Sequence, residues 1–405
     1  MKLKLIPKCL AMGLVSLFAS SSGVLAQADE KIDNLQKQID ALQARLNQAK
    51  DEGGRPGFLG NQNETLKFNF YGETKWNIKD GADKPDPHRF VLIPGYKLSD
   101  YAYFLAEIEI EHGGVQDNPG RFDGMLELEQ FYADVKITDN ISWRSLGVSL
   151  IPVGTVNQYH EPDQFYSVHR PVMYKYVVPS TWFETGTGFF GENLGGMEEL
   201  SWMLYFSQGL TDDQGTFDTL GEWNPRGARP SLREDDGNDA LAITGKLEYQ
   251  KGNFSGSVST YMTSLQRSNG TETDMQLFDI EASYRFTEGA FRNFELIADY
   301  AWWDIDDPSI FGDNNVGEKM DGYRLEVAYH HMMGNNELVP FIRAEGYDLS
   351  SDGNYSGFVE AGSYNYLSYG MMYKFGTNWE IKATMRQSLD DDSKSEFSFG
   401  VGFQF

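Results

Sequence analysis

The chain has 405 residues, a formal net charge of −26 and a single cysteine, Cys9. A chain this acidic is not expected to bind nucleic acid, because the phosphate backbone attracts basic surfaces. The mature chain lacks cysteine once the first 26 residues are removed, so no disulfide can stabilise it. A secreted chain of this length must then depend on a buried core, on ligands or on a closed sheet.

Residues 1–26 have the composition of a cleaved secretory signal peptide. Lys2, Lys4 and Lys8 flank or precede the apolar run "CLAMGLVSLFA", and the segment ends in the small-residue pattern "VLA". Cleavage removes three lysines and no acid, which leaves a net charge near −29. No later stretch approaches the roughly 20 continuous apolar residues of a spanning helix, so any membrane-spanning part is expected to consist of strands.

Residues 27–50 predict a short periplasmic coiled coil. In "KIDNLQKQIDALQARLNQAK" apolar residues recur three and four positions apart, at Ile32, Leu35, Ile39, Leu42 and Leu46. So short a helix is expected to form only with copies of itself or with a partner, and an isolated amphipathic helix on a surface is the alternative. Residues 29–50 are therefore a candidate binding segment for a periplasmic or cell-wall partner, and residues 51–65 predict a flexible linker.

From Leu66 to Phe405 the hydrophobic pattern has a period of two. It is clear in "LKFNFYGETKWNIK", in "YFLAEIEIEH" and in the terminal "EFSFGVGFQF". Strands with one apolar and one charged face are typical of a transmembrane barrel, which has lipid outside and water inside. A soluble sandwich also alternates, but it seldom needs charges along the whole opposite face. Residues 66–405 therefore predict an all-β, antiparallel transmembrane barrel.

The connections between these strands predict the strand number. Tight turns such as "ITDNIS", "YQKGNF" and "FGTNW" alternate with longer acidic connections. Counting back from Phe405, both termini lie on the same side only if "FETGTGFFGE" is an additional strand, which gives roughly 16 strands and an open aqueous lumen. The acidic connections are expected to be solvated loops, with bridging of anionic lipid head groups by divalent cations as the alternative.

One connection, which begins "IPVGTVNQYHEPDQFYSVHRPVMYKYVV", is long and rich in proline. Its prolines at positions 152, 162, 171 and 179 stiffen it and prevent it from pairing as a strand. It lies between an ascending and a descending strand, and this position predicts a loop that folds into the lumen and constricts it.

The motifs "IPVG", "NQYHEP" and "PSTWFETGTGFFGE", with the upstream "LELEQFYADVKI", resemble bacterial outer-membrane porins related to the phosphate-selective porin superfamily. The resemblance is strongest over residues 125–195. It implies a 16-stranded barrel, usually trimeric, in which the third loop forms the constriction, and it implies passive transport. The loop contains only Arg170 and Lys175, whereas the phosphate-selective members have a dense basic run, so the sequence does not predict phosphate selectivity.

The predicted site comprises loop residues and inward strand positions with charged or imidazole side chains. These residues are His160, Glu161, Asp163, His169, Arg170, Lys175, Glu107, Glu109, Glu111, Arg285, Arg324, Arg343, Lys382 and Arg386, and alternation adds Lys67 and Lys75. Segregation of acids and bases on opposite walls would impose a transverse field on the pore. The alternative is that these charges pair with one another, as Arg324 with Glu326 and Arg343 with Glu345.

Aromatic side chains predicted to face inward are Tyr103, Trp143, Trp303, Phe341 and Tyr347. They could stack against sugars, but packing between the strands and the loop is the favoured interpretation.

The histidines suggest no metal site and no catalytic set. His330 and His331 are adjacent on a strand, so their side chains point to opposite faces. His88 and His112 lie at the start and the end of predicted strands and complete no group with a nucleophile. His160, Glu161 and Pro162 are expected to anchor the loop to the wall by hydrogen bonds, with a solute contact at the constriction as the alternative. No metal, cofactor or catalytic residue is therefore predicted.

The sequence thus predicts an outer-membrane porin, a water-filled channel for passive diffusion of small hydrophilic solutes or ions, and not an enzyme. The expected partners are outer-membrane lipid, lipopolysaccharide and two further copies in a homotrimer, although an Ile-and-Leu seam is more typical of two-stranded coils. A structural tether that uses the N-terminal coiled coil is the alternative, and a hydrolase carried on the barrel is a weaker one.

Overall fold

The computed structural model describes residues 66–78, 84–114, 124–211, 225–230, 232, 240–266, 270–311, 317–351 and 363–405. All of them belong to one compact unit, Gln62–Phe405. The predicted signal peptide, coiled coil and linker lie outside the described residues. No helix in the described ranges is long and apolar enough to cross a membrane.

The described chain is dominated by antiparallel strands. They are β1 (Leu66–Ile78), β2 (Pro85–Ser99), β3 (Ala102–Glu111), β4 (Leu126–Lys136), β5 (Ile141–Leu150), β6 (Phe183–Gly191), β7 (Leu200–Ser207), β8 (Ala242–Lys251), β9 (Phe254–Gln266), β10 (Glu272–Arg285), β11 (Phe294–Ile305), β12 (Lys319–Tyr329), β13 (His331–Met333), β14 (Asn336–Asp348), β15 (Ser363–Phe375), β16 (Trp379–Ser388) and β17 (Glu396–Gln404). The short helices are α2 (Thr155–Gln158), η1 (Pro162–Gln164), α3 (Met173–Tyr176), η2 (Leu194–Gly196), η3 (Pro308–Phe311) and η4 (Asp392–Lys394).

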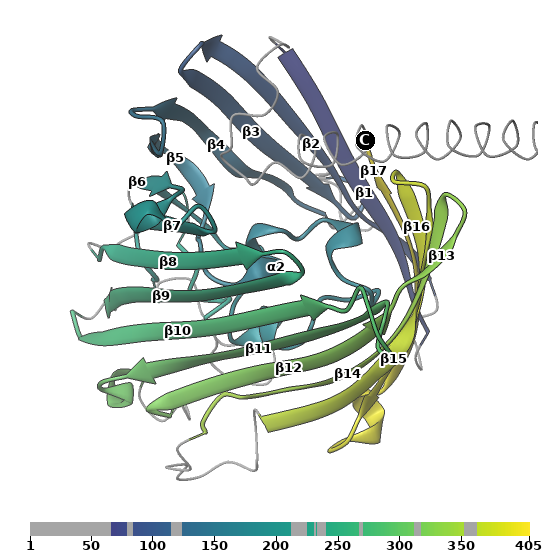
Figure 1. Cartoon of the computed structure of the whole chain (residues 1–405). Coiled ribbons are helices and arrows are strands. Elements are labelled where there is room, and N and C mark those ends of the chain that lie inside the picture. Colours follow the sequence, from purple (N-terminus) through teal and green to yellow (C-terminus); the bar gives the residue numbers. More distant parts are fainter. Residues whose placement is uncertain are drawn as a thin grey trace, which may run out of the picture. The chain divides into compact units, whose positions relative to one another are not determined.

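The strands form one closed antiparallel barrel. Each strand pairs with its neighbours in the sequence, except that β12 and β13 both pair with β14, and β1 pairs with both β2 and β17 (Figure 1). β12 and β13 are two parts of one wall strand, because both pair with β14 and are interrupted only at His330. The wall therefore has sixteen strands, which confirms the predicted number, and the predicted additional strand "FETGTGFFGE" is β6.

The C-terminal residue takes part in closing the barrel. The backbone N–H of Phe405 donates to the carbonyl of Phe70 at 2.8 Å, and the N–H of Phe70 donates back to Phe405 at 3.0 Å. The two rings stack with their centroids 4.8 Å apart. The alternation in the last ten residues thus belongs to a strand that joins the two ends of the sheet.

The two rims of the barrel differ in their connections. At one rim the turns are short; β8 and β9, for example, are joined by residues 252–253 alone. The opposite rim has the two longest connections, residues 151–182 and residues 208–241. This alternation is the pattern that barrel proteins of outer membranes show.

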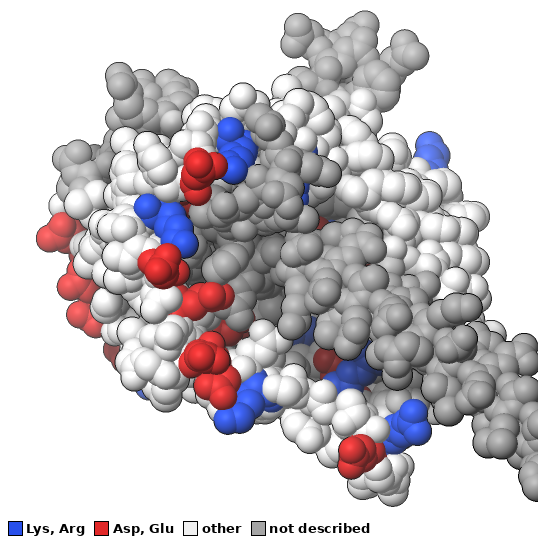
Figure 2. Space-filling view, turned by 45° about the horizontal axis from the view of Figure 1, so that its top comes forward, with Lys and Arg blue, Asp and Glu red and all other residues white. Residues whose placement is uncertain are grey.

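The outer face of the wall is apolar and the inner face is charged. In β12, Leu325 and Val327 face outward and are exposed, whereas Arg324 and Glu326, which alternate with them, are buried. In Figure 2 the wall on the right of the view is almost free of charged side chains, which gather around the rim. This arrangement is the reverse of a soluble protein, and it is suited to a hydrocarbon environment.

The hydrophobic core lies inside the barrel, between residues 151–182 and the inner wall. Trp182 of this segment packs against Tyr261 and Trp303, with ring centroids 4.5 and 6.3 Å from its own. Tyr176 stacks on Tyr347 at 4.3 Å. The inward aromatic residues of these strands therefore act as packing, as the favoured interpretation of the sequence expected.

The outer face provides a test of the lipid environment. Leu325 lies in the middle of β12 and is 57% exposed. We expect Leu325→Arg to reduce the free energy of unfolding in lipid vesicles by about 2–4 kcal/mol, because the charge must enter hydrocarbon.

Leu325→Ala is the matched control and removes the apolar contact without adding charge. Denaturant titration in vesicles measures both variants. Equal stability of the arginine and alanine variants would show that this face does not contact hydrocarbon.

Candidate functional site: the interior of the barrel

The β5–β6 segment, residues 151–182, occupies the candidate site. It carries α2, η1 and α3 between the ends of β5 and β6. Most of its side chains are buried, and its polar contacts reach strands on several sides of the barrel. In Figure 1 it runs between the curved walls.

Backbone groups of the β5–β6 segment bind charged side chains of the wall. The N–H of Thr155 donates to Glu281 Oε1 and the N–H of Val172 donates to Glu345 Oε2, both at 2.7 Å. Lys382 donates to the carbonyl of Phe165 at 2.7 Å and also to the carbonyl of Pro162. These side chains satisfy backbone groups that an irregular buried segment would otherwise leave unpaired.

The predicted anchor His160 lies in a buried cluster of charged and phenolic side chains. Its Nε2 is 2.9 Å from the Tyr71 hydroxyl, 3.5 Å from Glu129 Oε2 and 3.8 Å from Glu107 Oε1. Tyr71 donates to Glu107 at 3.0 Å. The segment is therefore attached here to β1, β3 and β4.

Arg89 of β2 connects this cluster to the segment backbone. Its Nη2 donates to the carbonyl of His160 at 2.6 Å, its Nε donates to Glu73 at 2.7 Å, and its Nη1 is 3.6 Å from Glu109 Oε2. Sequence reasoning did not identify this residue. The apolar run after it obscures the alternation, and a bulge between Glu73 and Lys75 shifts the register of β1 and β2.

Asp163 attaches the segment to the last strands of the barrel. Its Oδ2 is 3.2 Å from Lys374 Nζ and accepts a hydrogen bond from Gln404 at 2.9 Å. Burial alone would raise the pKa of Asp163, but the Lys374 charge and the hydrogen bonds from Gln404 and Gln164 hold this pKa below its usual value. The carboxylate form of Asp163 is thus favoured.

The other predicted loop residues have varied surroundings. His169 is partly buried, 2.8 Å from Asn77 Oδ1, and burial together with the Lys75 and Arg386 charges holds its pKa well below the usual value. Burial lowers the pKa of Arg170 to about 10.

Burial also raises the pKa of Glu161. Lys175 is the exposed member of this group, with its Nζ 5.1 Å from the centre of the Tyr176 ring.

Most of the predicted inward charges pair with one another. Arg324 Nε is 2.5 Å from Asp299 Oδ2 rather than beside Glu326. Arg343 contacts both Glu326 and Glu345 at 3.0 Å, and Arg386 contacts Glu396.

This pairing favours the alternative to an open transverse field, because paired charges largely cancel at a distance. Glu107 and Glu109 are buried, whereas Lys67, Glu111 and Arg285 are only partly buried.

In β5 the residues that face inward are not those that the alternating pattern predicts. Trp143 faces outward and is 37% exposed, so its prediction as an inward residue is wrong. Arg144 is the buried residue, and its Nε donates to Asp134 at 2.9 Å. A bulge between Arg144 and Gly147 disrupts the period of two. Trp303, Phe341 and Tyr347 are buried, and Tyr103 is half-buried.

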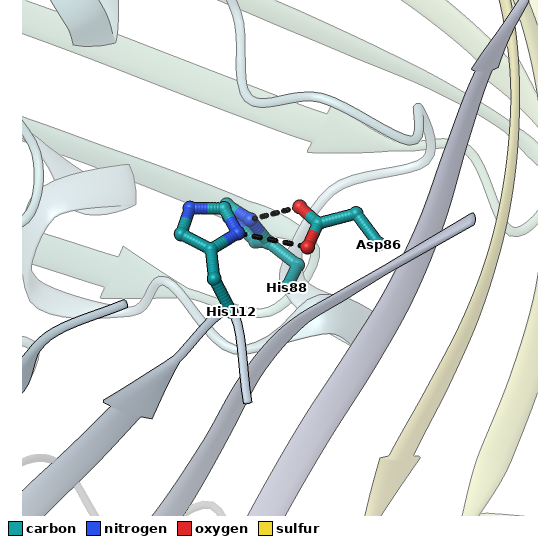
Figure 3. Close-up of side chains that lie close together, drawn as sticks. All are labelled: Asp86, His88 and His112. Atoms are coloured by element: carbon teal, nitrogen blue, oxygen red, sulfur yellow. Dashed lines mark hydrogen bonds and ion pairs between the residues drawn. The ribbon is translucent and has the colours of Figure 1, made fainter. Parts of the chain in front are cut away.

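Two groups of side chains in the described ranges have the composition of metal ligands. Glu107, Glu129 and His160 form a buried group, and Asp86, His88 and His112 form a second group (Figure 3). Within each group the potential ligand atoms lie within 4.8 Å of one another. The sequence did not indicate the second group, because His112 is brought beside His88 by strand pairing rather than by spacing.

No protein-family model matches the sequence. An uncharacterized protein of Aquifex aeolicus (strain VF5) is 29% identical over 278 residues, which cover 65% of this chain and 61% of that protein. The chain thus matches about three fifths of the length of this relative.

Solved structures establish the fold. The anion-selective porin from Comamonas acidovorans superposes with a TM-score of 0.54 at 12% identity, over 84% of this chain and 99% of the porin. The outer-membrane channel DcaP of Acinetobacter baumannii gives 0.52 at 12% identity, over 84% and 97%.

The trimer form of OmpT, an outer-membrane protein of Vibrio cholerae, gives 0.51 at 11% identity, over 84% and 99%. The chain therefore has the fold of outer-membrane porins.

Arg89 provides a test of how the interior is stabilised. We expect Arg89→Met to reduce the free energy of unfolding by about 3–5 kcal/mol, because Glu109 would lose its cation while buried and Glu73 would keep only Lys75. Denaturant unfolding of the detergent-solubilised barrel measures the change.

Arg285→Met is the matched control, because Arg285 is 43% exposed and lies 3.4 Å from Glu337. Its loss is expected to cost less than about 1 kcal/mol. A small change in both variants would contradict a stabilising role of Arg89.

Proposed function

We propose that this protein is an outer-membrane porin, a water-filled channel through which small hydrophilic solutes or ions diffuse passively. The observation that carries the proposal is a closed sixteen-stranded wall with an apolar outer face and a charged inner face. Barrels of this size leave room for an aqueous channel. The porin fold of the solved structures supports the proposal.

In this proposal the β5–β6 segment is the constriction. Its buried residues hold it against the wall, so His160 and Asp163 are anchors rather than solute contacts. Lys175 is exposed and is the best candidate for direct contact with a solute, and Arg170 retains its charge at neutral pH even with a lowered pKa. The resemblance to phosphate-selective porins concerns the sequence of this region. Its two cations, Arg170 and Lys175, are too few to form a continuous row of phosphate-binding side chains.

The surroundings of the barrel follow from the same proposal. The apolar outer face would contact outer-membrane lipid, and contact of the acidic connections with the anionic head groups of lipopolysaccharide would require bridging divalent cations. A homotrimer is supported by the trimer form of Vibrio cholerae OmpT, which shares the fold. Residues 27–50 would lie in the periplasm.

The channel is tested by reconstitution in planar bilayers. The purified mature protein is expected to produce stepwise increases in ion conductance, because each inserted pore adds one conducting unit. Protein that shows the heat-modifiable electrophoretic mobility of a folded barrel and inserts into the bilayer, but produces no conductance steps, would refute the channel.

Charge reversal at the proposed constriction makes the test specific. Lys175→Glu should shift the reversal potential in a salt gradient toward cations. Lys251→Glu is the control, since Lys251 lies at the end of β8 with its side chain 66% exposed and 3.0 Å from Glu199.

A tether is a second function that can coexist with the channel. It is motivated by the heptad seam of residues 29–50. Deletion of residues 29–50 is expected to abolish envelope attachment, measured by co-sedimentation with purified cell wall, and to leave single-channel conductance unchanged. Unchanged co-sedimentation would rule out the tether without affecting the channel.

His160 and His330, the candidate bases of a hydrolase, do not lie beside a serine or threonine nucleophile in the part of the chain that the structure describes. Their side-chain partners there are tyrosine hydroxyls and carboxylates. His169 Nε2, in contrast, is 3.2 Å from Ser398 Oγ and 2.8 Å from Asn77 Oδ1.

A further inference from the structure

We propose that Asp86, His88 and His112 form a binding site for a divalent transition-metal ion at the rim that carries the long connections. Asp86 and His88 lie near the start of β2, and His112 directly follows β3. The site adjoins Arg89 and Glu73 but shares no residue with the cluster around His160, and the proposal does not depend on the channel.

The three side chains converge on one point. The carboxylate of Asp86 faces both imidazoles from one side, with His112 Nδ1 2.8 Å from its Oδ1 and His88 Nδ1 3.5 Å from its Oδ2 (Figure 3). Donor atoms that share an ion at bond lengths of about 2.0–2.2 Å lie roughly 3–4 Å apart. The observed separations therefore need only small side-chain rotations to admit an ion.

The backbone fixes the two histidines side by side. The N–H of His112 donates to the carbonyl of His88 at 3.1 Å, and the adjacent residues Arg89 and Glu111 are register partners in β2 and β3. The two rings are 5.5 Å apart at an angle of 70°. The donors are thus presented by paired strands at the rim of a closed sheet.

The surrounding charges are compatible with a cation. The nearest basic groups, Lys75 and Arg89, both contact Glu73, at 3.0 and 2.7 Å, and Arg89 also faces Glu109. Glu73 Oε1 lies 4.0 Å from Nε2 of His88. This separation is too long for a hydrogen bond, so Glu73 adds a negative charge near the site without fixing the ring of His88.

The donor set indicates the class of ion. Two imidazoles and one carboxylate suit Zn²⁺, Cu²⁺, Ni²⁺ or Co²⁺, whereas Mg²⁺ and Ca²⁺ prefer oxygen ligands alone. Three protein ligands leave coordination positions open to water, so the ion is expected to exchange with solution.

The test uses the full mature chain in detergent, without a histidine tag, titrated calorimetrically with Zn²⁺. We expect one ion per chain, and at least an approximately tenfold loss of affinity in His112→Asn and in Asp86→Asn. Mg²⁺ in excess should not compete. The electron paramagnetic resonance spectrum of Cu²⁺ should show two coordinating nitrogens in the wild type and one in His112→Asn.

The controls distinguish this site from other side chains that could bind a metal ion. His331→Asn removes an exposed histidine of β13 and should bind Zn²⁺ as the wild type does. His160→Gln tests the buried group of Glu107, Glu129 and His160 and should retain binding. Heat-modifiable mobility verifies that each variant forms the barrel, and the exposed position of His112 in a turn makes its variant the least disruptive.

Three results would overturn the proposal. They are the absence of saturable binding in the wild type, wild-type affinity in both His112→Asn and Asp86→Asn, and loss of binding in His160→Gln alone.

Discussion

The hydrogen bonding between β1 and β17 is the constraint on which the rest of this structure depends. An open sheet would present unpaired N–H and C=O groups at two edges, and a hydrocarbon environment cannot satisfy them. Here the pairing from Tyr71 with Gln404 to Ile78 with Phe397, extended by the bonds between Phe70 and Phe405, removes both edges. Closure then fixes which face of every strand points inward, so it decides where the charges are buried.

Burial of so many charges inside the wall requires partners for each of them. The β5–β6 segment supplies some of these partners, because its backbone and hydroxyl groups bind Glu281, Glu345 and Lys382. Arg343 illustrates the shared arrangement, since it contacts Ser167 of the segment as well as Glu326 and Glu345 of the wall. The segment and the inner wall therefore stabilise each other, and neither is expected to keep its conformation alone.

Apolar packing holds the other side of the segment. Trp182, Tyr261 and Trp303 form a buried cluster within the barrel, and Trp303 donates to the carbonyl of Val177 at 2.8 Å. A segment held by aromatic packing on one wall and by ion pairs on the other has little freedom to move as a unit.

The amino-acid sequence by itself determined the class of fold, because the period of two and the alternating connections are local properties that survive without knowledge of contacts. It predicted about sixteen strands and an apolar outer face, and it distinguished the connection between β5 and β6 by its length and its prolines. It did not determine the partners of all the charges, because Arg324 binds Asp299 on the neighbouring strand. It also did not identify Arg89 and Arg144 as buried residues, because bulges in their strand pairs shift the register. Only the tertiary structure brought Asp86, His88 and His112 together, because the distance between paired strands depends on register and closure rather than on separation along the chain.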